Sequence, residues 1–549
     1  MQIKRYFYTL RYLKWSQIYW RLRYKLIKVK PNLDAAPELR ITESNWKQVT
    51  RKKISIIGIN QFDFLNKSHD VCNALDWNNP KYDKLWLYNL HYFDDLNAIN
   101  SQSRTASHMQ LIDRWINENP PGYGNGWEAY PISLRICNWI KWSLSDNPMN
   151  NMWQQSLAIQ ARLLNRKIEW HILGNHLFTN AKALVFAGVF FNGDEAEKWL
   201  NTGLLIIDRE LDEQILLDGG HFELSPMYHS IILEDILDLI HLYCIYEYEV
   251  PTKWQEKAEK MLRWLDIMTH PDGQIVLFND SAFEIALSPG DLVKYGNSLR
   301  ILSIRNSNKH ISHLKETGYI KVEQDICSAY LDVAQIGPDY LPGHAHADSL
   351  NFELSIEKQR VFVDSGTSVY GVSEERGRQR STRAHNTVCI DQEDSSEVWS
   401  GFRVARRAKV YDVNIVENNE QLLVGAKHDG YIRLKGKPIH ERCWQFSDKT
   451  LRISDILSGQ GSHEVEINWH IHPNLKVETS EQVVSICDDA GREVCRLEID
   501  PLLTVSLCGS SYHPQFGMRI DNIKIECKYE GRFPITFMNT IHWNDALVR

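Results

Sequence analysis

The chain has 549 residues, which is too long for one compact core, so we expect two large domains or three smaller ones. A net charge of -8 with 24% charged residues gives no global signature of nucleic-acid binding. No run of about 18 apolar residues occurs, so the sequence predicts no membrane-spanning helix. The ten cysteines are scattered without a CxxC pair, which argues against a zinc ribbon and against a disulfide framework.

Residues 1–30 are basic and aromatic. They contain nine Lys or Arg residues, eight aromatic residues and no acidic residue. The segment lacks the apolar core and the small-residue cleavage site of a secretory signal. It fits a basic amphipathic helix that lies on an anionic membrane surface, or one that packs on its own domain with a solvated basic face. We therefore expect a bacterial-type cell envelope or membrane-associated location with peripheral membrane contact through residues 1–30, and the cytoplasmic face is the alternative.

Residues 81–317 repeatedly show helical spacing of apolar side chains, separated by Gly, Asn and Pro. The runs are 132–140, 157–164, 181–187, 200–211 and 231–242. Successive amphipathic segments of ordinary length with short connections predict an α-helical array. Residues 1–80 form the basic aromatic segment and a lead-in to this domain.

Residues 318–549 change to a period of two, which is typical of half-buried strands. Leu350, Phe352 and Leu354 alternate with polar neighbours, and similar short runs recur to the end of the chain. Many short strands at regular spacing predict an antiparallel β-sandwich. The expected fold class is therefore α+β and multidomain, with the active site in the groove between the two domains.

The segment 343–387 concentrates residues that carry chemistry. It holds His344, His346 and Asp348, then Asp364, and then His385. If His344 and His346 lie on one strand, the period of two points both rings to the same face. Two imidazoles and a carboxylate are a common set of zinc ligands, and one histidine would remain for chemistry. The alternative is that these residues are solvated loop histidines and turn aspartates.

Three polar clusters interrupt the amphipathic pattern of the helical domain. The first holds Trp127 and Tyr130, followed by Arg135 and Asn138, which are three apart and share a helix face. Each of the other two clusters lies at the start of a predicted helix. One contains Asn175 with His176, and the other contains Tyr228 with His229. Polar residues at helix openings are often caps, and Thr179, Asn180 and Ser225 are candidates for that simpler role.

With these motifs, residues 80–470 resemble the heparinase II/III-like polysaccharide lyases. The segments that carry the resemblance, strong in their order and spacing, are 175–176, 223–229, 344–348, 364–366 and 383–387. The resemblance implies an incomplete (α/α) toroid in the N-terminal part, followed by an antiparallel β-sandwich. It supports the division into two domains that periodicity indicates.

The resemblance also implies β-elimination at a uronic acid, in which C5 loses a proton and O4 is the leaving group. Asn175, with His176, would hydrogen-bond the substrate carboxylate and spread its charge. Tyr228 would be the general acid at O4, and His344 the other proton-transfer group. Relatives hold a zinc ion at positions that correspond here to His346, Asp364 and His385, with a fourth ligand left unidentified.

Cationic and aromatic residues near these motifs are candidates for binding an anionic polysaccharide. The candidates are Trp127, Tyr130, Arg135, Asn138, Tyr370, Arg380 and Arg383. Arginine pairs with carboxylate or sulfate in bidentate fashion, which suits such a glycan. The alternative is ordinary surface charge or packing at strand ends. Asp280 is expected to be a structural hydrogen-bonding residue at the end of the helical domain.

Four functions fit these residues to different degrees. The best is a polysaccharide lyase that cleaves a uronate glycan. A uronate C5-epimerase on the same fold shares the first proton abstraction, so the sequence separates the two poorly. A non-catalytic glycan-binding or assembly protein of an envelope polysaccharide pathway has no need of proton-transfer groups. Glycoside hydrolysis needs two facing carboxylates, and the spacing of Glu128, Asp218 and Glu223 does not demand it.

Overall fold

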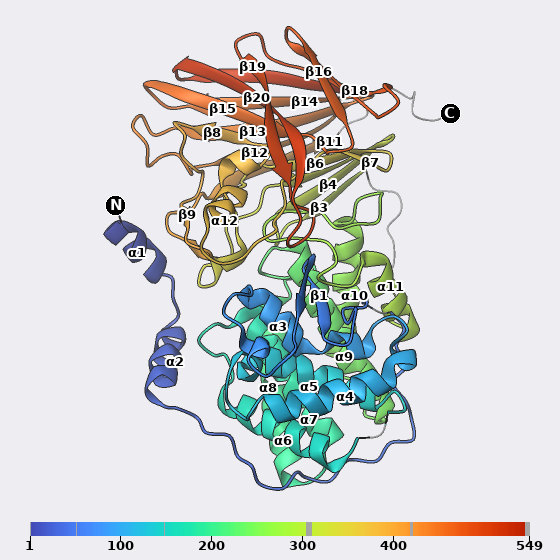
Figure 1. Ribbon diagram of the computed structural model, residues 1–549. Coiled ribbons are helices and arrows are strands. Elements are labelled where there is room, and N and C mark those ends of the chain that lie inside the picture. Colours follow the sequence, from blue (N-terminus) through green and yellow to red (C-terminus); the bar gives the residue numbers. More distant parts are fainter. Residues whose placement is uncertain (1, 51, 148, 303–309, 418–420, 544–549) are drawn as a thin grey trace.

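The computed structural model describes residues 2–50, 52–147, 149–302, 310–417 and 421–543. A helical half and a β-sheet half lie end to end, with the helical half at the bottom of Figure 1 and the sheets above it. The last helix of the lower half ends at Ser298, and the first strand of the upper half begins at Ile311. This strand precedes residue 318, at which the sequence placed the start of the β domain.

The helical half is built from nine helices among the described residues. They are α3 (Lys84–Tyr92), α4 (Thr105–Glu118), α5 (Ala129–Ser143), α6 (Asn151–Arg166), α7 (Gly174–Phe190), α8 (Asp194–Gln214), α9 (Pro226–Ile245), α10 (Thr252–Ile267) and α11 (Pro289–Ser298). Helices α5, α7 and α9 bury nearly every side chain, whereas α4, α6, α8 and α10 bury one face. Apolar side chains on all sides of a helix require other helices around it. The three buried helices therefore form the inside of the toroid.

Helices α7 and α8 pack at close range because each carries a glycine where they meet. A Cβ built on Gly188 of α7 would lie 2.5 Å from the backbone nitrogen of Leu200. A Cβ on Gly203 of α8 would lie 2.7 Å from Val185 and 2.8 Å from the carbonyl oxygen of Ala181. All three distances are shorter than a real Cβ contact, so only glycine allows this approach.

Among the described residues, the β-sheet half contains three large antiparallel sheets. One has the order β3-β4-β5-β6-β7, another β11-β12-β13-β14-β21-β18-β17-β16, and the third β19-β20-β15-β8. The strands are β3 (Ile311–Leu314), β4 (Tyr319–Gln324), β5 (Cys327–Asp332), β6 (Phe352–Ile356), β7 (Gln359–Phe362), β8 (Val388–Ile390), β11 (Val410–Glu417), β12 (Leu422–His428), β13 (Ile439–Ser447), β14 (Thr450–Ser458), β15 (Ser462–His470), β16 (Lys476–Ser480), β17 (Val483–Cys487), β18 (Glu493–Glu498), β19 (Thr504–Tyr512), β20 (Ile520–Arg532) and β21 (Ile535–Trp543).

The sheets enclose a common core. Strand β13 shows the sequence pattern directly, because its buried and half-buried residues alternate from end to end. Its buried positions include Trp444 and Phe446, which join a cluster with Phe352 and Trp469 from the other two sheets. Alternation with a period of two places one face of each strand in the core. Two short hairpins complete the strands: β1 (Gln61–Phe64) with β2 (Lys67–Asp70), and β9 (Val398–Trp399) with β10 (Arg403–Val404).

A small hydrophobic cluster joins the two halves. Trp264 and Met268 at the end of α10 pack with Phe278, Tyr319 and Tyr330. The Tyr319 hydroxyl also donates to the carbonyl oxygen of residue 224, at 2.7 Å, across the junction. The sheet β3–β7 therefore rests on the toroid, and the loops at this junction are held close to the openings of α7 and α9.

Residues 2–26 form two helices in place of the single amphipathic helix that the sequence suggested. They are α1 (Gln2–Leu10) and α2 (Trp15–Leu26), and they lie beside the junction of the two halves (Figure 1). Beyond α2 the chain runs along the outside of the toroid and is attached there, for example by Arg40 N–H to the carbonyl of Phe190 at 2.8 Å. Within the described residues, no helix is both long enough and apolar enough to span a bilayer.

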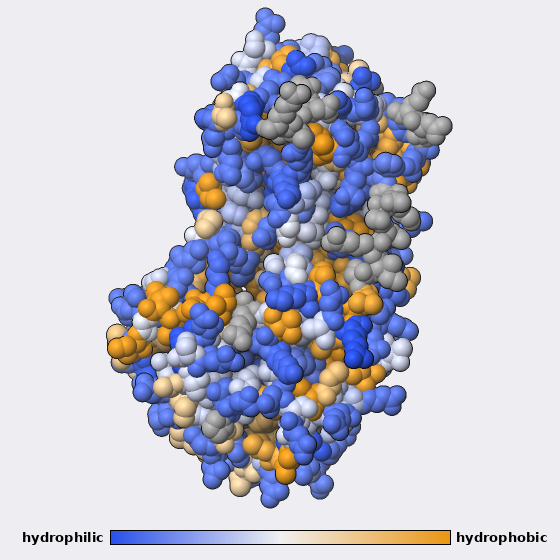
Figure 2. All heavy atoms as spheres, turned by 90° about the vertical axis from the view of Figure 1, so that its right-hand side faces the viewer, coloured by the Kyte–Doolittle hydropathy of each residue, from blue (hydrophilic) through white to orange (hydrophobic). Residues whose placement is uncertain are grey.

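Figure 2 shows the face turned away from α1 and α2, with apolar side chains in small groups, more of them on the helical half.

Candidate active site

A cleft of about 1770 Å³ lies where the toroid meets the sheets. Its floor comes from helices α3, α5, α7 and α9, and its roof from the loops 339–344, 368–373, 400–403 and 513–519. Helices α1 and α2 contribute to one side. All four residues predicted to be catalytic, Asn175, His176, Tyr228 and His344, line this cleft. The fold therefore brings together motifs that are separated by up to 169 positions in the chain.

Tyr228 and His344 face each other across the domain junction. Tyr228 is in the first turn of α9, where Ser225 caps the helix by accepting from the Tyr228 backbone N–H at 3.2 Å. The simpler role proposed for Ser225 is therefore confirmed. The Tyr228 and His344 ring centroids are 4.0 Å apart, and the Tyr228 hydroxyl is 3.0 Å from that of Tyr370. Burial raises the pKa of Tyr228 well above its ordinary value, so its hydroxyl keeps its proton.

His344 and His346 do not lie on a strand, so the conformation assumed for them in the sequence is wrong. His344 ends a short 3₁₀ helix, Pro342–His344, and His346 follows in an irregular segment. Both rings nevertheless bond the same carboxylate, that of Asp280. His344 Nδ1 is 2.9 Å from Oδ2 of Asp280, and His346 Nε2 is 2.9 Å from its Oδ1.

Asp280 is fully buried, and its charge is balanced by Arg376, whose two guanidinium nitrogens bond its two oxygens. Burial alone would raise the pKa of Asp280, but Arg376 and the two histidine bonds hold it well below its usual range. An ionised Asp280 accepts hydrogen from Nδ1 of His344, which leaves the lone pair on Nε2. That nitrogen is the one positioned to take a proton in the cleft.

Asn175 opens helix α7 beside a second carboxylate, that of Glu223. The Asn175 side-chain nitrogen lies 2.9 and 3.1 Å from the two oxygens of Glu223, and its backbone N–H donates to the same group at 3.0 Å. Glu223 is also 3.7 Å from Nε2 of His344. A substrate carboxylate that binds the Asn175 amide therefore has to share it with Glu223.

His176 is the partly exposed imidazole of the cleft. Its Nδ1 is 3.1 Å from Glu169, and its ring lies 4.4 Å from that of Tyr130. Burial lowers the pKa of His176, but the adjacent Glu169 outweighs that effect and the net shift is upward. Asn180 holds Glu169 in place by accepting from its backbone N–H at 2.8 Å and donating to its carboxylate at 3.1 Å. Asn180 is therefore a positioning residue rather than a helix cap.

Tyr130, Asn138 and Tyr370 line the cleft, as expected for substrate-binding residues. Trp127 and Arg135 do not, and the prediction that they contact a glycan is wrong. Trp127 is buried, and its indole nitrogen donates a hydrogen bond to the carbonyl oxygen of residue 119. Arg135 is fully buried, stacks 3.9 Å from the ring of Trp115, and donates to protein carbonyls. Backbone carbonyls thus satisfy the guanidinium in place of a substrate anion.

Arg380 and Arg383 are also directed away from the cleft. Arg380 is buried and donates to the carbonyl oxygens of Ala345 and Gly401, so it fixes the loops around His344 without contacting a ligand. Arg383 lies outside the cleft lining and pairs with Glu466 at 3.3 Å. A direct glycan clamp by these two arginines is therefore another prediction that the structure contradicts.

The candidate metal centre is next to the proton-transfer groups. His346, Asp348 and His385 are buried, and one possible ligand atom of each lies within 4.8 Å of the others. Three atoms there have no hydrogen-bond partner: Nδ1 of His346, Oδ2 of Asp348 and Nε2 of His385. Asp364, the predicted third ligand, instead bonds Nδ1 of His385 at 2.8 Å. The donor set fits Zn²⁺, with Asp348 in the position given to Asp364 and Asp364 orienting His385.

Two family models match nearly the whole chain. Residues 19–288 match the model described as heparinase II/III N-terminus, and residues 306–537 match heparinase II/III-like, C-terminal. The chain belongs to the heparinase II/III family. The resemblance stated from the sequence motifs is thereby confirmed.

Curated members of the heparinase II/III family similar to this chain are named heparin-sulfate lyases. The one from Bacteroides stercoris is 26% identical over 319 residues, covering 54% of this chain and 45% of the relative. The one from Bacteroides thetaiotaomicron is 24% identical over 438 residues, covering 70% and 59%. The matched regions thus span about half the length of these relatives.

A solved structure titled heparinase III aligns over 95% of this chain and 88% of its own, with a TM-score of 0.68 and 18% identity. A chondroitin AC lyase from Streptomyces coelicolor aligns over 84% and 75%, with a TM-score of 0.54 and 10% identity. At these identities the likeness concerns the fold. It confirms the toroid followed by the β-sandwich for this member of the heparinase II/III family.

Two exposed arginines lie at the cleft. The sequence offered the run 399–407, which contains Arg403, either as part of the groove lining or as a strand with solvated arginines, whereas it did not single out Arg21. Arg21 of α2 and Arg403 of β10 both line the cleft. Burial and then the positive charge of Arg403 lower the pKa of Arg21. Among the described residues neither has an ion-pair partner within 4.0 Å. Only the fold places both residues at one cleft, because they are 382 positions apart in the chain.

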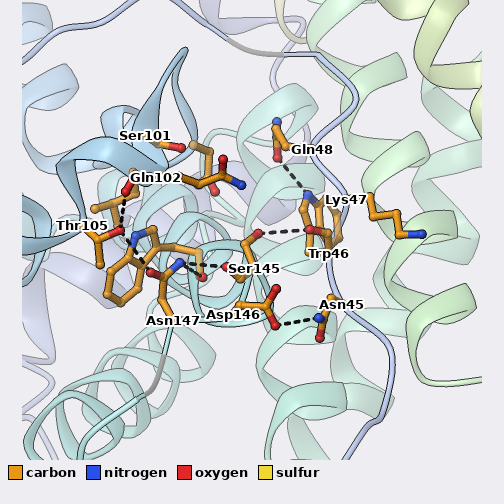
Figure 3. Close-up of a pocket in the computed structure, with 13 residues that line it drawn as sticks. Asn45, Trp46, Lys47, Gln48, Ser101, Gln102, Thr105, Ser145, Asp146 and Asn147 are labelled. Carbon is orange, nitrogen blue, oxygen red and sulfur yellow. Dashed lines mark hydrogen bonds between the residues drawn. The ribbon is translucent and has the colours of Figure 1, made fainter.

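A second cavity, of about 320 Å³, lies in the helical half and is shown in Figure 3. Its polar side chains mostly bond one another, as Asn45 does with Asp146 at 2.6 Å and Trp46 with Gln48 at 2.9 Å. None of the predicted site residues lines it, and no histidine or tyrosine does.

Proposed function

We propose that this chain is a polysaccharide lyase that cleaves a uronate-containing anionic glycan by β-elimination. The observation that carries the proposal is the close contact of the Tyr228 and His344 rings in an interdomain cleft that also holds Asn175 and His176. A protonated phenol and an imidazole with a directed lone pair supply an acid and a base at one place. The names of the curated relatives support the same reaction class.

In the proposed reaction, Nε2 of His344 removes the proton from C5 of the uronate. The electron pair of that C–H bond becomes the C4=C5 double bond, and the C4–O4 bond breaks. The Tyr228 hydroxyl donates its proton to the departing O4, so the product chain end is neutral. Asp280 holds His344 in the tautomer that this step requires and stabilises the imidazolium that forms.

The negative charge that develops on the uronate carboxylate needs hydrogen-bond donors. His176 is suited to this task because Glu169 favours its protonated form while its Nε2 remains without a partner among the described residues. Asn175 supplies an amide from the opening of the same helix, α7. Donors placed where charge develops lower the barrier more than they stabilise the bound substrate.

The test is an ultraviolet scan of the protein with a panel of uronate polysaccharides, including heparan, heparosan, chondroitin, hyaluronan and alginate. A lyase produces an unsaturated uronate that absorbs, and Tyr228→Phe is expected to abolish the signal. Tyr123→Phe is the matched control, because Tyr123 is exposed and lies outside the cleft lining. Solvent deuterium entering C5 without chain cleavage would replace the lyase with a C5-epimerase, and binding with neither reaction would indicate a glycan-binding protein.

We also propose a zinc ion bound by His346, Asp348 and His385. Its support is the convergence of three buried atoms that lack partners. When bound, zinc would brace the loops that carry His344. We expect about one zinc per chain by elemental analysis, and a lower melting temperature after chelation. His385→Ala should remove both effects, whereas the exposed His310→Ala should change neither. A metal-free protein whose melting temperature is insensitive to chelator would contradict the proposal.

A further inference from the structure

Helix α2 packs against the protein with one face and exposes the opposite face. Gln17, Trp20 and Tyr24 point toward the body of the molecule. The Gln17 side chain donates to the carbonyl of residue 340 at 3.4 Å, Trp20 stacks on Trp170 at 6.2 Å, and the Tyr24 hydroxyl donates to the carbonyl of residue 168. These contacts hold the helix against the edge of the cleft.

The opposite face of α2 carries an exposed apolar stripe, defined as Trp15, Tyr19, Leu22 and Leu26. Their exposed fractions are 85%, 57%, 57% and 82%. The spacing of four, three and four residues keeps all four side chains within about 60° around the helix axis. Four large side chains exposed in one row on one helix are unusual for a surface that contacts only water.

Basic side chains flank the stripe. Arg23 and Lys25 are exposed and lie about 80° to either side of its midline. Helix α1 adds Phe7, which is 64% exposed, with Lys4 and Arg11 exposed near it in sequence. Residues 1–30 contain no acid, in a chain whose net charge is -8. The positive charge is therefore concentrated where the apolar stripe is.

We propose that α1 and α2 bind the surface of an anionic lipid bilayer, with the stripe inserted at the level of the headgroups. Trp and Tyr favour that level, leucine side chains reach the acyl boundary, and Lys and Arg are attracted to anionic headgroups. An anionic glycan would use the charges but not the leucines, so the combination favours lipid. Because Gln17 and Arg21 of α2 line the cleft, docking through the stripe keeps the cleft beside the bilayer.

The experiment is co-sedimentation of the 549-residue chain with phosphatidylcholine vesicles and with vesicles in which about 30% of the lipid is phosphatidylserine. We expect binding to the anionic vesicles to be at least about tenfold tighter, and to weaken in about 0.5 M salt because the charges are screened. The variant Trp15→Ser, Tyr19→Ser, Leu22→Ser, Leu26→Ser should lose at least about tenfold in affinity. Arg23→Glu with Lys25→Glu should remove the preference for phosphatidylserine.

The control is Leu205→Ser with Leu217→Ser, which changes two leucines that are 75% and 78% exposed on the toroid. It should bind like the unchanged chain. Circular dichroism and melting temperature establish that each variant is folded. Equal binding by the stripe variant, or no binding by the unchanged chain, would overturn the proposal. A dimer that the stripe variant converts to a monomer, without vesicle binding, would assign the stripe to a second copy. The assay contains no glycan, so its result is independent of the proposed lyase activity.

Discussion

Asp280 shows how one buried side chain organises the candidate site. It bonds His344 and His346 from one side and Arg376 from the other, and it has no exposed surface. The sequence suggested only a structural role for it. Its position gives it a second one, because the tautomer of His344 depends on the proton that Asp280 accepts.

We predict that Asp280→Asn lowers kcat by about 10²–10⁴-fold with little change in KM, because an amide no longer fixes the His344 tautomer. The measurement is the pH profile of uronate cleavage. Removing the carboxylate also leaves Arg376 charged and buried, which costs about 3–5 kcal/mol of stability. Asp280→Asn combined with Arg376→Gln avoids the unpaired charge and should remain slow. Full activity in the double variant would contradict the role of Asp280.

A second prediction at this scale concerns His176. Replacement of Glu169 by Gln removes the charge that raises the pKa of His176, so less of the imidazole is protonated near neutral pH. We expect uronate cleavage to shift toward lower pH, and His176→Ala to lose activity at all pH values. An unchanged pH profile in Glu169→Gln would show that His176 acts in its neutral form. The exposed Glu247→Gln is the control.

At the scale of the elements, α2 and the hairpin β9–β10 each place one exposed arginine at the cleft, Arg21 and Arg403. We predict that Arg21→Ala with Arg403→Ala raises KM for a charged glycan about tenfold or more and leaves kcat nearly unchanged, because these residues attract substrate and lie apart from the proton-transfer groups. The rise should shrink in high salt. Arg492→Ala, which removes an exposed arginine on the sandwich, should change neither constant. A loss confined to kcat would contradict the prediction.

The packing of α7 on α8 gives a prediction about stability. Gly188→Ala places a methyl group against the backbone of α8, and we expect it to lower the free energy of unfolding by about 1–3 kcal/mol. Gly377→Ala is the matched control, because Gly377 also lies in a helix, α12 (Glu374–Gln379), but has no atom within 4 Å of the added group. It should be neutral or stabilising. Urea unfolding of the two variants measures the difference, and equal stabilities would contradict close packing at Gly188.

At the scale of the whole molecule, buried histidines set the response to acid. Burial lowers the pKa of His91 and His229 to about 3 and that of His221 to about 4. In the unfolded chain histidine titrates near pH 6.5, so below that pH the unfolded state binds more protons. Between about pH 6.5 and pH 4 the free energy of unfolding should therefore decrease as the pH is lowered, by up to about 1.4 kcal/mol per pH unit for each histidine.

Urea unfolding at a series of pH values measures this slope. His176 contributes with the opposite sign above about pH 6.5, because its pKa is raised, so the comparison is made below that pH. His229→Gln should reduce the number of protons taken up on unfolding by up to one, and the slope should decrease accordingly. A stability that is constant from about pH 6.5 to pH 5 would show that the buried imidazoles become protonated without unfolding.

The sequence by itself determined the class of fold, the family and the proximity of the main motifs. Helical and strand periodicities reflect which side of each element is buried, and that information is local. The motifs around Asn175, Tyr228 and His344 were recognisable because short segments carry them. The predicted domain boundaries and the catalytic roles remain predictions.

Only the tertiary structure decided which charged residues are available to a ligand. Arg135 and Arg380 looked like glycan clamps but are buried and donate to protein carbonyls, whereas Arg21 and Arg403, from distant parts of the chain, both line the cleft. Asp348 rather than Asp364 completes the candidate metal set for the same reason. A side chain's role depends on which distant segments surround it, and its sequence neighbours do not specify those long-range contacts.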